Sequence, residues 1–245
     1  MRTALLAAAV LLVAAGAVPV QADEASWQQL NSKANVLKRQ GKYAEAIEMG
    51  KQSLQTAEQE FGPEHFNVAV ALRNLGLAYT LKQEFWEAKP LLERAVDIAQ
   101  KKVGQESFFV ATLLADLADI YYVTKVDAKT EEMYKKSLQI REKLLGPDDL
   151  LVAQSLHGLA RFYGRQQRTA EAEQLYKRAL AIIRHNSPEH IYMPFFMKEL
   201  AKIYSSEGNS ALSNALIRRA AALESRLYQE RTKGIKKQVA ETANP

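Results

Sequence analysis

The chain has 245 residues and carries 33 lysines and arginines against 28 aspartates and glutamates, a formal net charge of +5. Its hydrophobic content of 47% is enough to bury a sizeable core, which excludes a wholly disordered chain and a collagen-like fibre. It contains no cysteine, which excludes disulfides, thiolate metal sites, iron–sulfur clusters and cysteine nucleophiles.

Residues 1–22 have the composition of a signal peptide. Met1-Arg2 gives a positive start, and the apolar run over 4–18 is shorter than the roughly 20 residues that a membrane-spanning helix needs. Small residues at Val20 and Ala22 suit signal peptidase, so we expect cleavage after Ala22 and export to a periplasm or to the outside of the cell. The alternative interpretation is an uncleaved N-terminal anchor.

After the predicted signal, the sequence repeats itself with a period of about 42 residues. One connecting-loop pattern recurs at offsets of 42, 42 and 41 residues, in segments that begin at Phe61, Val103, Leu145 and Asn186. Between these loops a second pattern recurs in segments that begin at Leu75, Leu117, Leu159 and Leu200. A fifth, degenerate copy starts near Ser26. Such a period indicates an array of stacked repeats.

Each copy is predicted to be a pair of antiparallel helices. Leu75, Gly76 and Tyr79 lie on one face of a first helix. Twelve residues after Gly76, a second helix presents another small residue, Ala88, against which the first helix packs. The short turns within the pairs are predicted to contain Gly41, Gln83, Lys125 and Gln167. In the longer connectors, glycine is expected to cap the second helix and proline to lie in the first turn of the next helix. Because one hairpin cannot bury both faces, consecutive hairpins must stack into an all-α solenoid.

These repeats resemble those of tetratricopeptide-repeat proteins. The connector with Gly-Pro-Glu-His at 62–65 and the segment Glu171–Leu180 are similar to the 42-residue variant found in kinesin light chain. The resemblance covers about residues 25–225. It implies a right-handed superhelix of about five hairpins, whose first helices line a concave groove that binds peptides or partner proteins.

The two ends of the array depart from this pattern. The first copy has Lys33 where leucine is expected and Gly50 where a bulky residue is expected, and the last copy has Ser213 for alanine. Polar terminal units keep the outer faces of an array soluble. We therefore predict a solenoid over residues 23–227 and a basic tail over 228–245, which continues the last helix or frays.

The resemblance also indicates which positions line the groove. Read through the five copies, they hold Asn31 and Asn35, Arg73 and Leu77, Ala115 and Asp119, His157 and Arg161, and Lys198 and Lys202. Five of the six ionisable side chains in this set are cationic or can become so. We therefore expect a positive C-terminal half of the groove that captures an acidic segment or a free carboxylate. The alternative is that these are ordinary exposed side chains. The family's carboxylate clamp is not reproduced, because Asn31 stands where its first lysine would be.

The sequence contains no glycine-rich phosphate loop, no Gly-x-Ser-x-Gly elbow and no His-Glu-x-x-His motif. His65 and His190 occupy equivalent connector positions, which favours a capping role, and Tyr79, Tyr121, Tyr163 and Tyr204 are predicted to be hairpin core. We expect a non-catalytic adaptor without cofactor or metal that binds a protein or peptide, not nucleic acid. Two alternatives remain: an assembly subunit of an envelope or secretion complex that docks through its convex or edge surface, and an enzyme with an unrecognised site.

Overall fold

The computed structural model describes residues 20–187 and 190–242, and the regular secondary structure in these residues is entirely helical. Most of the predicted signal segment, residues 1–19, lies outside the described residues. The helices are α1 (Val20–Arg39), α2 (Tyr43–Phe61), α3 (Phe66–Leu81), α4 (Phe85–Val103), α5 (Phe108–Val123), α6 (Asp127–Leu145), α7 (Leu150–Arg165), α8 (Thr169–Asn186), α9 (Met193–Ser206) and α10 (Ser210–Thr242). None of them, within the described ranges, is long and apolar enough to cross a bilayer.

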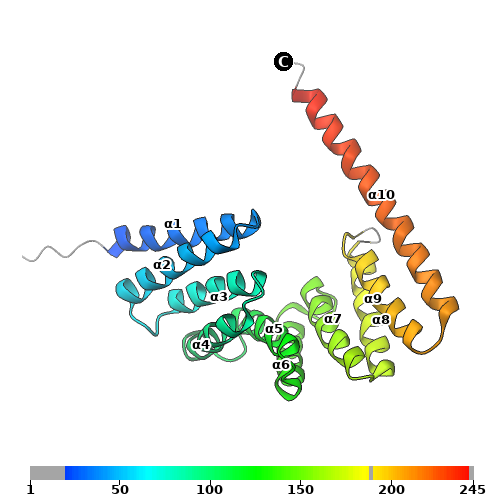
Figure 1. The fold of residues 1–245 in the computed structure, drawn as a ribbon, viewed down its shortest axis with the longest axis horizontal. Coiled ribbons are helices and arrows are strands. Elements are labelled where there is room, and N and C mark those ends of the chain that lie inside the picture. The colour runs from blue at the N-terminus through cyan, green and yellow to red at the C-terminus, as the bar shows by residue number, and fades with distance from the viewer. Residues whose placement is uncertain (1–19, 188–189, 243–245) are drawn as a thin grey trace, which may run out of the picture.

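The helices form five hairpins that stack in chain order. Each odd-numbered helix, here called a first helix, packs against the even-numbered second helix that follows it, and from α3 onwards also against the preceding hairpin (Figure 1). The predicted all-α solenoid is therefore confirmed. The predicted basic tail continues α10 as far as Thr242, so this helix extends well beyond α9 (Figure 1).

Turns and caps mostly follow the predicted residues. Gly41, Gln83, Lys125 and Gln167 all have positive φ, between 60° and 75°, in the short turns within the hairpins. Gly62, Gly104 and Gly146 have φ near 84° at the ends of second helices, where a residue with a Cβ would be strained.

The predicted place of the connector prolines is wrong. Pro63 and Pro147 precede α3 and α7 rather than lying in their first turns. His65 and Asp149 cap these helices instead, because their side chains accept the backbone N–H groups of Asn67 and Leu151 at 3.2 and 2.7 Å. The predicted capping role of His65 is thereby confirmed.

Close approach of small residues holds the hairpins together, as predicted for the second repeat. A Cβ at Gly76 would lie 3.0 Å from Leu92 Cγ, and both Ala88 and Leu92 are fully buried. Tyr121, Tyr163 and Tyr204 are core residues. The Tyr163 and Tyr204 hydroxyl groups also reach back to Glu131 and Glu173, at 2.9 and 2.8 Å, on the second helix of the preceding hairpin. The same residues therefore build one hairpin and join it to its neighbour.

A substitution at Gly158 should test this packing. A Cβ at this position would lie 2.6 Å from Cε1 of Tyr134, a buried ring whose hydroxyl donates to Asp119 at 2.6 Å. Because the ring is held at both ends, Gly158→Val should lower the free energy of unfolding by about 2 kcal/mol. Urea denaturation measures this change. Gln139→Val, at an exposed position of α6, is the control and should cost roughly 0.5 kcal/mol. Equal losses in the two variants would contradict the packing argument.

Candidate functional site

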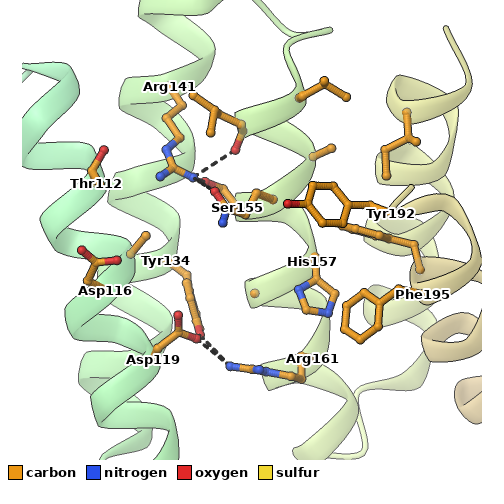
Figure 2. Close-up of a pocket in the computed structure, with 18 of the residues that line it drawn as sticks. Thr112, Asp116, Asp119, Tyr134, Arg141, Ser155, His157, Arg161, Tyr192 and Phe195 are labelled. Atoms are coloured by element: carbon orange, nitrogen blue, oxygen red, sulfur yellow. Dashed lines mark hydrogen bonds and ion pairs between the residues drawn. The ribbon is translucent and has the colours of Figure 1, made fainter. Parts of the chain in front are cut away.

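A pocket of about 830 Å³ opens on the face formed by the first helices α5, α7 and α9. Figure 2 shows that it extends across α7, with Thr112, Asp116 and Asp119 on one side and Tyr192 and Phe195 on the other. Its apolar lining includes Phe108, Leu150, Ile183, Tyr192, Phe195 and Phe196, and its charged lining comprises Arg73, Asp116, Asp119, Arg141 and Arg161. The pocket therefore offers both apolar surface and charge to a ligand.

Five of the predicted groove residues meet in this pocket. Arg73, Ala115, Asp119, His157 and Arg161 line it, although they come from three different first helices.

The other predicted groove residues lie elsewhere. Asn35 and Leu77 line a separate hollow between α1 and α3, and the Asn31 side-chain oxygen accepts a hydrogen bond from the Asn74 amide at 2.7 Å. Lys198 and Lys202 are on α9 but do not line the pocket.

The cations of the predicted set have carboxylate partners within the chain. Arg73 Nε lies 2.6 Å from Asp116 Oδ2, and Arg161 Nη2 lies 2.6 Å from Asp119 Oδ1. Lys198 and Lys202 pair with Glu224 and Glu199 at 2.7 and 2.5 Å. The positive charge counted from the sequence is therefore largely compensated along this face.

His157 is neutral at pH 7 rather than a further cation. Its ring is surrounded by Tyr176, Phe195 and Phe196, with centroid separations of 4.9–5.9 Å. Burial lowers the pKa of His157 to about 4, and the neighbouring Arg161 guanidinium contributes to this shift. Its Nε2 is buried and has no hydrogen-bond partner among the described residues. The imidazole therefore belongs to the aromatic wall between α7 and α9.

The sequence analysis missed Arg141, a buried arginine of α6 that lines the same pocket. Only 3% of the residue is exposed, and its Nη1 donates to Leu151 O at 3.0 Å, Ser155 Oγ at 2.8 Å and Gln154 Oε1 at 3.4 Å. All three acceptors are neutral. Among the described residues, no carboxylate lies within ion-pair distance of this guanidinium. Burial lowers the pKa of Arg141 from its usual value. Because that usual value is very high, the guanidinium group still carries its charge at pH 7.

A signal for this arginine was present in the repeat itself. In three of the other four copies the matching positions hold Ala57, Ala99 and Ile183, all fully buried apolar residues, and in the last copy, which no further hairpin follows, the position holds the exposed Glu224. Its partner Ser155 likewise matches Leu113 in the preceding copy and Phe196 in the next. Two polar residues thus replace apolar core residues at one place in the array.

The pocket contains one imidazole, that of His157. It contacts aromatic rings, and among the described residues its Nε2 has no hydrogen-bond partner. In the part of the chain that the structure describes, no group of three or more histidine, aspartate or glutamate side chains is arranged to hold a metal ion. What the pocket provides is a concave surface with fixed charges and aromatic rings.

Comparison with known families supports the fold. The tetratricopeptide-repeat family model matches residues 28–101 and 109–185, which together make up more than half of the chain. No curated protein matches significantly.

Several solved structures are similar to this one. A kinesin light chain from Podospora anserina with nearly identical TPR-like repeats is 23% identical, with a TM-score of 0.71 over 86% of this chain and 98% of that one. BtubC (BKLC) from P. vanneervenii is 20% identical, with a TM-score of 0.70 over 86% and 93%. MamA is 13% identical, with a TM-score of 0.56 over 80% and 96%. At these identities the likeness shows the fold alone.

The buried imidazole should make stability depend on pH in a defined window. The unfolded chain binds the proton near pH 6.5 and the folded chain near pH 4, so the unfolded state gains protons first as the pH falls. The contribution of neutral His157 is therefore complete above pH 6.5 and is lost as the pH falls towards 4. Between pH 7 and 4.5 the wild type should lose roughly 2.5 kcal/mol more than His157→Leu.

Urea denaturation of both proteins at the two pH values measures this difference. Because the same carboxylates titrate in the wild type and in His157→Leu, their contribution drops out when the two proteins are compared. An NMR titration of the imidazole Cε1–H provides an independent check. A midpoint near pH 6.5, with equal pH dependence of the two proteins, would show that the ring is not held neutral by its surroundings.

Proposed function

The chain belongs to the tetratricopeptide-repeat family, and we propose that it is a non-catalytic adaptor that captures a segment of a partner protein in the groove lined by its first helices. The observation that carries this proposal is the pocket across α5, α7 and α9, where five predicted groove residues come together. Stacked hairpins present such concave surfaces as a consequence of their curvature.

Exposed aromatic rings at the pocket can supply binding energy. Tyr192 and Phe195 are 59% and 47% exposed, although both are large apolar side chains. Covering them with a partner side chain would remove apolar surface from water, and aromatic anchors of this kind dominate many interfaces. The exposed ion pair between Arg161 and Asp119 would contribute to orientation more than to affinity.

The alternative function, an assembly subunit that docks through an edge, is favoured by a different surface. Trp86 at the start of α4 is 75% exposed, and Leu81 at the end of α3 is 48% exposed. These two residues flank the turn between α3 and α4, at the edge of the solenoid rather than in the pocket. They provide the natural comparison for the groove.

Matched aromatic substitutions should distinguish groove from edge. Peptides selected on the purified chain from a random library should bind Phe195→Ala about tenfold more weakly than the wild type, because their apolar anchor loses its contact surface. Trp86→Ala should bind them with unchanged affinity. Fluorescence anisotropy measures both dissociation constants, and circular dichroism checks that the variants are folded.

The same two positions can be tested against the natural partner. A photo-crosslinking amino acid at position 195 should capture it in cells, and one at position 86 should not. Capture only from position 86, or weaker peptide binding only in Trp86→Ala, would support the assembly subunit and contradict groove capture.

We also propose that the chain is exported and that its mature form begins at Asp23. The support is the composition of residues 1–22, together with a structural fact: cleavage after Ala22 removes only the start of α1 and leaves the buried side chain of Trp27 in the mature chain. Mass spectrometry of the exported protein should give Asp23 as its first residue. Ala22→Glu should block cleavage, because signal peptidase requires a small residue there. A chain that keeps Met1 and stays in the cytoplasm would contradict export.

A further inference from the structure

The charged lining of the pocket contains one more positive than negative group. It holds the guanidinium groups of Arg73, Arg141 and Arg161 against the carboxylates of Asp116 and Asp119. The two carboxylates lie 2.6 Å from Arg73 and Arg161, which leaves Arg141 with neutral acceptors. The nearby carboxylate of Asp149 lies outside the lining and accepts the Leu151 N–H at the start of α7. The surplus charge therefore belongs to Arg141.

Arg141 still has hydrogen-bonding capacity. Its Nη1 makes all the hydrogen bonds described above, and its Nε has no partner among the described residues. Figure 2 shows the rest of the guanidinium directed away from Ser155, towards the gap between α5 and α7 that Thr112 and Asp116 border. A buried guanidinium without a carboxylate is costly, and an anion that enters this gap would offset the cost through charge-assisted hydrogen bonds.

The opposite side of the pocket is suited to an apolar group. Tyr192 and Phe195 lie across α7 from Arg141, and Phe195 packs on the neutral ring of His157 (Figure 2). The volume of about 830 Å³ is in the range of small-molecule pockets, roughly 300–1,000 Å³, which combine a mainly apolar lining with a few fixed polar groups.

We propose that this pocket binds an organic monocarboxylate with an apolar body. The carboxylate accepts hydrogen bonds from Arg141, and the body lies across α7 against Tyr192 and Phe195. A single carboxylate matches the single surplus charge, whereas a second negative group would find the remaining guanidinium groups of the lining already paired with Asp116 and Asp119. The inference goes beyond the adaptor function, since the acid is a small ligand of its own that would occupy the same part of the groove as a partner segment.

A pair of probes that differ only in charge tests the proposal. 4-Phenylbutyrate should bind the full chain at least about tenfold more tightly than 4-phenylbutyramide, measured by isothermal titration calorimetry or NMR titration. Arg141→Gln should weaken binding of the acid about tenfold, to the level of the amide, and leave the amide unchanged. Arg141→Lys should retain part of the preference for the acid, because it keeps the charge.

The matched control is Arg178→Gln. Arg178 is an exposed arginine of α8 that pairs with Glu142 of α6 at 2.6 Å, outside the pocket, so the acid should bind this variant as it binds the wild type. If Arg141→Gln does not fold, Thr112→Glu replaces it. The new carboxylate on α5 would occupy the gap beside Arg141 and should abolish binding of the acid while circular dichroism stays unchanged.

Peptides identify the source of the carboxylate. A short peptide that ends in phenylalanine is compared with its C-terminally amidated form. If amidation weakens the affinity of the peptide more than it weakens the affinity of phenylbutyrate, the site is assigned to the carboxylate of a chain terminus. Equal binding of acid and amide by the wild type, no binding of the acid, or equal binding of the acid by the wild type and Arg141→Gln would overturn the proposal. If selected peptides still bound through Phe195, the adaptor function would stand without the proposed acid site.

Discussion

The structure depends on the fact that no hairpin of this chain can bury both of its faces. Each first helix packs on its own second helix and on the hairpin before it, so the residues that close one unit also join the next. Tyr163 illustrates this double use: its ring is core, and its hydroxyl reaches Glu131 of the preceding hairpin. Stability then comes from nearest neighbours in a row, and the curved face lined by first helices results from that stacking.

The sequence was most informative where structure depends on local spacing. The positive φ values at Gln83, Lys125 and Gln167, and the close approach of Gly76 to Leu92, follow from residues within one repeat. The positions of the charges in the groove could be predicted, but their partners could not. Asp116 lies between the two predicted groove positions of α5, and Glu224 belongs to α10, so the pairs with Arg73 and Lys198 form only when separate helices meet. The low pKa of His157 likewise needs aromatic rings from α8 and α9.

The apolar core is interrupted where Arg141 lies. Buried apolar residues form one large cluster from Trp27 to Ile140 and another from Ala118 to Leu223, and the polar group of Arg141, Ser137 and Ser155 lies where the two meet. At the matching positions, three of the other four copies bury Ala57, Ala99 and Ile183 in place of the arginine. Alanine or isoleucine would pack here without the cost of burying a charge. A charged residue at a position that three other copies fill with apolar side chains is therefore consistent with the proposal that the pocket binds an anion.

The same reasoning applies to Gly158, which stands where the two preceding copies have Asn74 and Asp116. Its missing side chain makes room for the Tyr134 ring, whose hydroxyl then meets both Asp119 and Arg161. Regular positions of the repeat thus determine the shape of the solenoid, and positions that break the period determine the chemistry of its pocket. Under the proposals above, the selectivity of the pocket rests on these irregular positions, and Arg141, Ser155 and Gly158 all line it.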